Sequence, residues 1–446
     1  MNGKYLPSER GQALVLIILG FVVLMGFTAL AVDGSMLYSD RRYAQNAADA
    51  ASLAGAGAAA LYLEENNIIA SNWSCSGGAI NAGEFAAKNR AVTNGFTIDF
   101  DLSDDHGVDA YCGVENHPPY SKNYIDVRVR LTMPTKAQFV QFVYKGPLVN
   151  TVEAVTRIYP RRSLAWGEAI VALNDKICDG NVNGIQFRGD LTLNVVGGGV
   201  FSNGCLDVDG GNYPNICNGD LNFFYGGNFL DNIEFYDMPC EEDVDENSQT
   251  YSDLDDSMDE RIPYDSYFSS TPVCDSSNTI SANTFEGSTG LTGLICVTGD
   301  VKINTAPRSV QGTDVTIVML GGKFDISGGM SSLQAPPSDG SYITGIHGTA
   351  IPGLLIYMPV EYYGPWDSGC GLPENELQIN GNAMNAFVGT ILAPCTDVSL
   401  EGGGDTFAYQ SQVIGWNVNS GGTADLNVIY DEGKNFSKPT WLDFYR

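Results

Sequence analysis

An uncharged apolar run, Ala13–Val32 (ALVLIILGFVVLMGFTALAV), constrains the fold of this chain more than any other stretch. A helix of about 20 residues crosses a bilayer core of about 30 Å, whereas a core helix of a soluble domain carries polar residues along one face. The run is longer than the apolar region of a signal peptide, and no obvious cleavage motif follows it. We therefore expect an uncleaved transmembrane helix at 13–32, a cytoplasmic N-terminus at 1–12, and the bulk of the chain across the membrane.

The cysteines indicate which side of the membrane the bulk occupies, because basic residues flank the run on both sides and decide the orientation only weakly. No CxxC pair is present and only three residues are histidine, which disfavours zinc and thioredoxin-like chemistry. An even, dispersed set is typical of disulfides in an oxidising compartment, so we expect a single-pass membrane protein whose bulk is extracytoplasmic, at the cell surface. Sequence order suggests that Cys75 pairs with Cys112 in a first domain and that the others pair within a second. The ten cysteines are Cys75, Cys112, Cys178, Cys205, Cys217, Cys240, Cys274, Cys296, Cys370 and Cys395.

The charge balance limits the partners of this chain. Asp and Glu number 53 against 23 Lys and Arg, which gives a net charge of -30. Phosphates would be repelled, so nucleic acid is excluded and anionic lipid is disfavoured as the main partner. The 52 glycines favour turn-rich β structure over helical bundles.

Beyond the apolar run, Asp33, Gly34 and Ser35 mark the membrane exit, and helix-favouring residues resume at Met36. Alanine dominates residues 44–60 at three- and four-residue spacing, which predicts a small-residue face that another helix or a sheet can approach closely. We expect either a generic amphipathic helix or a long stalk, half in the membrane and half packed on a head.

The stretch RGQALVLIILGFVVLMGFTALAVDGSMLYSDRRYAQNAADAASLAGA resembles the N-terminus of TadG-like proteins of tight-adherence (Flp-type) pilus systems. The resemblance covers about 45 residues and extends more loosely to about residue 160. It implies a membrane-anchored pilus-assembly component or minor pilin-like adhesin whose partners are the membrane and other pilin-like proteins of a Tad pilus. The residues that carry it are Arg10, Gly11, Gln12, Asp33, Gly34, Tyr38, Arg41, Arg42, Gln45, Asn46, Ala47, Ala48, Asp49, Ala50 and Ala51.

One position departs from the pattern of related prepilins. Type III prepilins carry a glutamate at the fifth position after the cleaved glycine, and counting from Gly11 this position holds Leu16. The resemblance therefore does not imply processing by a prepilin peptidase or a role as a major pilin subunit.

Residues 33–160 are predicted to form a TadE/TadG-like, pilin-like α+β domain. A helix is expected at 82–96 with a C-cap at Asn94–Gly95, and strands at 124–133 and 148–160. In the first strand, the side chains of Ile125, Val127, Val129 and Leu131 should point inward and those of Asp126, Arg128 and Arg130 outward, with Pro134 ending the strand. The loop that contains Asp101, Asp104, Asp105 and His106 is interpreted as a solvated turn rather than a cation site.

Residues 164–446 change to short strands separated by glycine and asparagine turns, as in 293–304, 315–329, 376–404 and 412–431. Near the C-terminus the units recur roughly every 20 residues, which favours a right-handed parallel β-helix over the alternative of a β-sandwich or jelly roll. The acidic stretch 237–275 has no periodicity and is predicted to be an insertion.

No catalytic motif appears in a supporting context, so we expect no enzyme and no catalytic residue; His347 is interpreted as structural. The alternatives are a surface-tethered, polysaccharide-degrading β-helix enzyme, because such enzymes use this fold, and a structural envelope protein. The β domain is expected to contact a surface glycan or a host-surface ligand.

No cofactor is expected, apart from weak Ca²⁺ binding at the acidic candidates Asp253, Asp255 and Asp256, which lack EF-hand spacing. Four aromatic residues, Tyr362, Tyr363, Trp366 and Trp416, fit either a glycan platform or, as we favour, the filling of the core.

Overall fold

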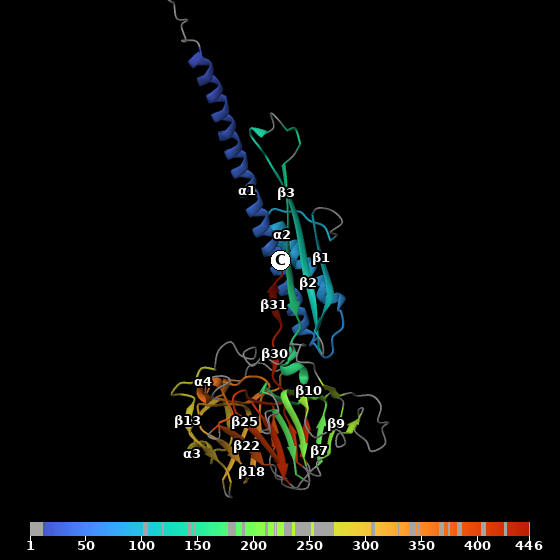
Figure 1. Cartoon of the computed structure of the whole chain (residues 1–446), viewed down its shortest axis with the longest axis vertical. Coiled ribbons are helices and arrows are strands. Elements are labelled where there is room, and N and C mark those ends of the chain that lie inside the picture. Colours follow the sequence, from blue (N-terminus) through green and yellow to red (C-terminus); the bar gives the residue numbers. More distant parts are fainter. Residues whose placement is uncertain are drawn as a thin grey trace, which may run out of the picture. The chain divides into compact units, whose positions relative to one another are not determined.

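The computed structural model divides the chain into two compact units (Figure 1). Unit 1 comprises Met1–Asn116, Ser121–Arg161 and Thr440–Arg446, and unit 2 comprises His117–Tyr120 and Arg162–Pro439. The structure describes residues 12–100, 106–117, 120–140, 144–146, 148–176, 184–189, 192–209, 213–217, 219, 221–226, 234–236, 251–253, 272–304, 308–328, 330–338, 344–345, 348–364, 370–372, 375–380, 386–402, 407–422 and 426–445.

Unit 1 begins with α1 (Gln12–Glu65), a single helix of 54 residues. The helix runs without a break through Asp33–Ser35, as expected of one long helix that continues beyond the apolar run. Glycine in a helix interior costs only about 1 kcal/mol, and packing of the following turns outweighs this. The second helix, α2 (Gly77–Thr93), starts earlier than expected. Its C-cap is Asn94, followed by Gly95 at a φ of +86°, which confirms the predicted C-cap.

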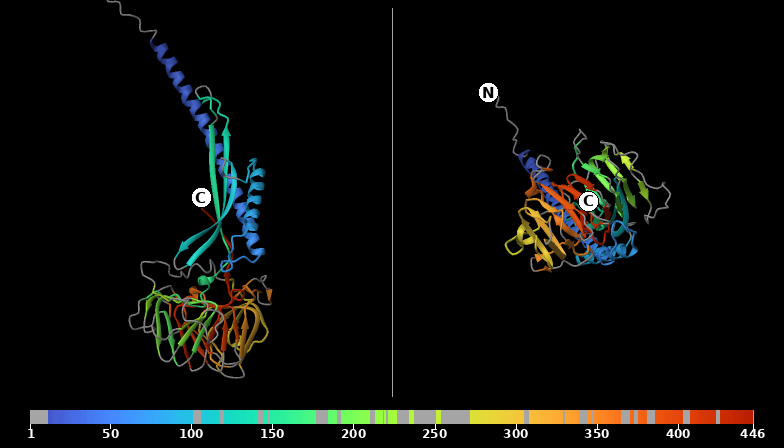
Figure 2. Two further views of the ribbon diagram at one scale, coloured as in Figure 1. Left: turned by 90° about the vertical axis from the view of Figure 1, so that its right-hand side faces the viewer. Right: turned by 90° about the horizontal axis from the view of Figure 1, so that it is seen from below.

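Both helices of unit 1 pack against an antiparallel sheet, with α1 alongside β3 (Figure 2). The sheet has the order β1 (Gly107–His117), β2 (Tyr120–Thr135), β3 (Leu148–Tyr159) and β31 (Trp441–Phe444). The prediction that 164–446 is one β-rich domain is wrong at its end, because β31 pairs with β3 in unit 1. The stacking of Trp441 on Tyr159, with ring centroids 4.5 Å apart, adds to this strand pairing.

Two predictions about β2 are also wrong. Asp126 does point away from Ile125, but it is 2 % exposed rather than solvated, because Arg157 on β3 and its neighbours cover it. The strand also continues through Pro134, which pairs with Val149. A proline is tolerated in a strand where no neighbouring strand requires its missing N–H.

Unit 2 is mainly β, as predicted, and its strands form three ladders of parallel pairs that the chain visits in turn. In stack order, ladder A contains β12 (Tyr251–Asp253), β10 (Leu221–Gly226), β8 (Val200–Asp209), β5 (Ile170–Ala172), β27 (Val413–Gly415), β24 (Thr390–Ala393), β21 (Leu354–Tyr357), β16 (Ser309–Met319), β14 (Leu291–Thr298) and β13 (Thr279–Ser281). Ladder B contains the end of β8, then β6 (Gly184–Arg188), β28 (Val418–Gly422), β25 (Asp397–Gly402), β22 (Glu376–Asn380), β17 (Phe324–Ile326) and β15 (Val301–Lys302). Ladder C contains β11 (Glu234–Tyr236), β9 (Tyr213–Cys217), β7 (Thr192–Val196), β29 (Leu426–Ile429), β26 (Phe407–Gln410), β23 (Ala386–Val388), β18 (Met330–Gln334) and the start of β16.

The remaining elements of unit 2 are short. They are the antiparallel pairs β4 (Arg162–Ser163) with β30 (Ser437–Lys438) and β19 (Thr344–Gly345) with β20 (Gly348–Thr349), and the helices η3 (Leu164–Gly167), α3 (Ala282–Phe285) and α4 (Val360–Tyr363).

The chain enters and leaves this stack at its middle, not at its ends. The first strands, β5, β6 and β7, pair on one side with β8 and β9 and on the other side with β27, β28 and β29. From β5 the ladders continue to β12 at one end, resume at β13 at the other end, and return to the middle. We call the contact between the β5–β7 and β27–β29 rungs the central seam.

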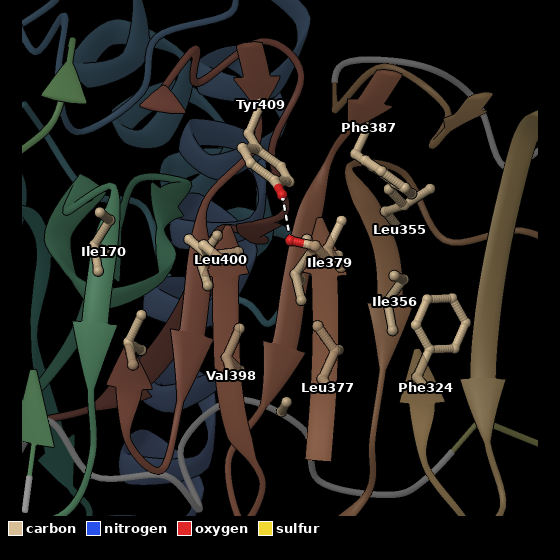
Figure 3. Close-up of a cluster of buried hydrophobic side chains, with 14 of the residues drawn as sticks. Ile170, Phe324, Leu355, Ile356, Leu377, Ile379, Phe387, Val398, Leu400 and Tyr409 are labelled. Carbon is tan, nitrogen blue, oxygen red and sulfur yellow. Dashed lines mark hydrogen bonds between the residues drawn. The ribbon is translucent and has the colours of Figure 1, made fainter. Parts of the chain in front are cut away.

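The core of unit 2 consists of aligned apolar side chains from successive rungs (Figure 3). Leu377 and Ile379 on β22 lie in register with Val398 and Leu400 on β25. The hydroxyl of Tyr409 donates a hydrogen bond of 2.9 Å to the carbonyl oxygen of Ile379, which satisfies a buried polar group. Ladder A is buried on its second face too, by a separate cluster that includes Trp416. This explains its near-continuous apolar strands.

Buried asparagines hold the central seam. The side chain of Asn174 donates to Oδ1 of Asn417 at 2.8 Å, and the backbone N–H of Gly184 donates to the same oxygen at 2.8 Å. Asn417 in turn donates to Oδ1 of Asp397 at 2.7 Å. Asn417 therefore joins groups from both sides of the seam.

Replacing Asn417 with leucine should destabilise unit 2 by about 3 kcal/mol, because each buried donor left without an acceptor costs about 1–3 kcal/mol. Two measurements test this prediction. The first is the midpoint of chemical unfolding, and the second is the rate of hydrogen exchange in β5–β7 and β27–β29. The control is Asn419→Leu on β28, two residues further along the chain, where the side chain is half-buried. Equal effects of the two substitutions would contradict the role assigned to Asn417.

Candidate membrane anchor and assembly interface

The first half of α1 has no packing partner among the described residues of the chain. Every large apolar side chain from Leu14 to Val32 is exposed. The most apolar 18-residue window of α1 has a mean hydropathy of 2.8 and no buried residue. A core helix would be buried, so this half is long and apolar enough to cross a membrane.

The second half of α1 packs closely on α2 and the sheet. Its small residues form a fully buried stripe that lies in one core cluster with side chains of α2, β2 and β3. The backbones approach closely at Gly55, where an added Cβ would lie 2.7 Å from the carbonyl oxygen of Gly83 and 2.8 Å from Cγ1 of Val127. The expected close-packing face is therefore present, and glycine permits it. The buried residues of the stripe are Ala44, Ala47, Ala48, Ala51, Ala56, Ala59 and Leu63.

Asp33, the first residue after the apolar half, fastens a distant loop to α1. Its Oδ1 accepts from the backbone N–H of Gln138 at 2.8 Å, and its Oδ2 accepts from those of Phe139 and Val140 at 3.0 and 2.5 Å. A second contact lies one turn further along, where the side chain of Asn150 donates to the carbonyl oxygen of Leu37. A carboxylate that receives three backbone N–H groups is strongly held, so Asp33 fixes the β2–β3 connection at the end of the apolar helix.

The other motif residues divide between the two sides of α1. Gln45 faces the sheet, where its side chain donates to Asp49 at 2.8 Å and to the carbonyl oxygen of Glu153 at 3.3 Å. Tyr38, Arg41, Arg42 and Asn46 are exposed, Gly34 borders open space, and Ala50 is half-buried. The guanidinium of Arg42 lies 5.9 Å from the centre of the Tyr38 ring. Arg10, Gly11 and the side chain of Gln12 lie outside the described residues.

The outer face of the sheet carries two groups of paired charges. Arg157 pairs with Asp126 through two hydrogen bonds, of 2.8 and 2.9 Å. Burial acts to raise the pKa of Glu153, but hydrogen bonding from Arg130 and the charge of Arg128 lower that pKa overall. These arginines and carboxylates therefore stabilise unit 1 and are not free for chemistry.

The structure joins Cys75 to Cys112, the pair that sequence order suggests, and it also joins Cys274 to Cys296 and Cys370 to Cys395. Cys205 is disulfide-bonded, and its partner lies outside the described side chains. The side chains of Cys178, Cys217 and Cys240 lie outside them too. Removing such a bond from a small domain costs about 2–5 kcal/mol.

The other candidate residues give no functional site in the described part of the chain. Tyr363 and Trp416 are buried in the core of unit 2, as favoured above, whereas Tyr362 is exposed. His106 accepts a hydrogen bond from the backbone N–H of Thr132. No group of three metal-ligating side chains occurs among the described residues. His347, Trp366, Asp101, Asp104, Asp105, Asp255, Asp256 and the side chain of Asp253 lie outside them, as does most of 237–275.

Sequence reasoning missed two parts of this site. It noted the alanine spacing but not Gly55 and Gly83, whose significance depends on the crossing of two helices. It also assigned Asp33 only to the membrane exit, although its partners lie more than 100 positions away. For the loop that contacts Asp33, the signal available in the sequence was the lack of acidic residues in 136–149.

A helix that is apolar and exposed in one half and packed on a small α+β unit in the other fits a single-span, membrane-anchored protein. Residues 11–59 match the family model "Putative Flp pilus-assembly TadE/G-like", which confirms the TadG-like N-terminus and supports a pilus-associated role. No curated protein and no solved structure shows a significant match to the chain.

Proposed function

We propose that this chain is a non-enzymatic, membrane-anchored component of a Tad-type pilus system, acting as an assembly factor or minor pilin-like adhesin. The observation that carries the proposal is the coincidence of the matched segment, 11–59, with α1. Its apolar half would lie in the bilayer, and its packed half would hold the α+β head. Other pilin-like proteins of the system are the proposed partners.

We infer that unit 2 is a parallel β-helix that serves as the outward spacer or adhesive module. Three ladders of parallel strands, visited repeatedly in the order A, B, C, support this interpretation, as does the apolar core between them. An antiparallel sandwich or jelly roll would require antiparallel ladders, whereas every pairing between described strands of the three ladders is parallel. The ligand class proposed for this module is a surface glycan or another cell-surface molecule.

The disulfides support an extracytoplasmic location for both units. Cys75–Cys112 lies in unit 1, and Cys274–Cys296 and Cys370–Cys395 lie in unit 2. Disulfides persist in oxidising compartments and are rare in the cytosol. With the apolar half of α1 in the membrane, the N-terminus would be cytoplasmic.

The test is gene deletion in the source cell, complemented by the wild-type chain or by a chain that lacks 14–32. Wild type should restore surface pili and attachment, and the deletion variant should not, since it has lost the anchor. Protease treatment of intact cells should degrade unit 2 if the topology is correct. Unchanged pili and attachment after gene deletion would contradict the proposed role.

A further inference from the structure

The β2–β3 connection has a composition opposite to that of the whole chain. Residues 136–149 (KAQFVQFVYKGPLV) contain two lysines and no acidic residue, in a chain of net charge -30. Among its described residues, Phe139 and Tyr144 are 43 % and 53 % exposed, and Lys136 and Lys145 are exposed as well. This surface, which we call the basic aromatic tip, comprises these four residues.

The level of the basic aromatic tip along α1 is fixed by Asp33. Nineteen apolar and small residues, Leu14–Val32, precede Asp33, and at 1.5 Å per residue they span about 28 Å, close to a bilayer core of about 30 Å. Asp33 receives hydrogen bonds from the N–H groups of Gln138, Phe139 and Val140. The end of β2 and the start of β3 lie beside α1 in both side views (Figures 1 and 2). The tip is therefore attached where the apolar helix would leave the bilayer.

We propose that the basic aromatic tip is a second membrane contact, which inserts its aromatic rings into the headgroup region and pairs its lysines with anionic lipid phosphates. Aromatic rings with an apolar body concentrate at membrane interfaces, and lysines there extend to the headgroups. Each lysine near an anionic surface strengthens binding about fivefold. The contact is local, so it is compatible with the acidic charge of the rest of the chain.

A single transmembrane helix leaves unit 1 free to tilt relative to the membrane surface. A second contact with the bilayer would restrict this tilt. The inference rests on the proposed membrane anchoring by α1. The partner proposed for the basic aromatic tip is the lipid surface. Quenching by labelled lipids distinguishes this partner from a second protein.

The test places the full-length chain in nanodiscs of equal parts phosphatidylcholine and phosphatidylglycerol. An environment-sensitive fluorescent residue replaces Phe139, and a matched variant carries it at Val114, an exposed apolar position on β1 near the opposite end of β2. Quenchers attached to lipid headgroups should quench the label at 139 several-fold more than the label at 114. Aqueous iodide should give the reverse order.

Two further variants test the contribution of the lysines and that of the attachment by Asp33 separately. Lys136→Glu combined with Lys145→Glu alters only exposed side chains and should return the label at 139 to water, as should nanodiscs without the anionic lipid. Asp33→Ala should release the tip as well. Chains that are retained in nanodiscs but show equal quenching at 139 and 114 would overturn this inference alone. Chains that are not retained would overturn the membrane anchor on which the proposed function depends.

Discussion

Replacing Gly55 with valine is expected to destabilise unit 1 by about 3 kcal/mol, since overpacking a close contact costs about 1–3 kcal/mol. The added Cβ alone would lie 2.7 Å from the Gly83 carbonyl oxygen, 2.8 Å from Val127 and 2.9 Å from Ala87. These atoms belong to α2 and β2, and one of them is backbone, so no single side-chain rotation relieves the contact. α1 and α2 would have to separate.

The measurement is hydrogen exchange of α2 amides in the full chain, which should accelerate about 100-fold for a loss of this size. The control is Gly57→Ala on the same helix, where an added Cβ meets nothing within 4 Å. Alanine is favoured over glycine in a helix by about 1 kcal/mol, so this substitution should slow exchange slightly. Exchange in the Gly55→Val chain equal to that of wild type would show that the helices do not approach as closely as described.

Replacing Asp126 with alanine is expected to cost unit 1 about 3–5 kcal/mol, because it leaves the buried guanidinium of Arg157 without its anion. Two hydrogen bonds of 2.8 and 2.9 Å join the pair. The guanidinium carbon also lies 3.6 Å from the centre of the Tyr124 ring and 3.9 Å from that of Tyr445. These rings shield the cation from water, so solvent cannot replace the lost carboxylate.

The double variant Asp126→Ala with Arg157→Met is the control, since it removes both charges and should recover much of the lost stability. The measurements are the unfolding midpoint of unit 1 and the rate of hydrogen exchange of the β2 and β3 amides. If the single and the double variant lose the same stability, the cause would be lost packing rather than an unpaired buried charge.

Local patterns in the sequence predicted the local features of this fold. The apolar run predicted the exposed half of α1, and the period-two alternation from Ile125 to Leu131 predicted the inner face of β2. The Asn94–Gly95 pair predicted the end of α2. Each of these signals lies within one element, and burial or backbone conformation determines each directly.

Distant partners could not be predicted in this way. Asp126 reads as an outward residue because its partner Arg157 lies on another strand. Asn174 and Asn417 are 243 positions apart, and no local period indicates that they meet. The same holds for Asp33 and its loop, where the motif residue was visible but its structural role was not.

The central seam has a consequence for how the chain folds as it is synthesised. The rungs β5–β7 form early in the chain, yet one edge of each of these strands stays unpaired until β27–β29 have been made. Contacts of such long sequence separation form slowly, and open strand edges invite pairing with other chains. Unit 2 can therefore complete its central seam only after β27–β29, its last rungs, have been synthesised.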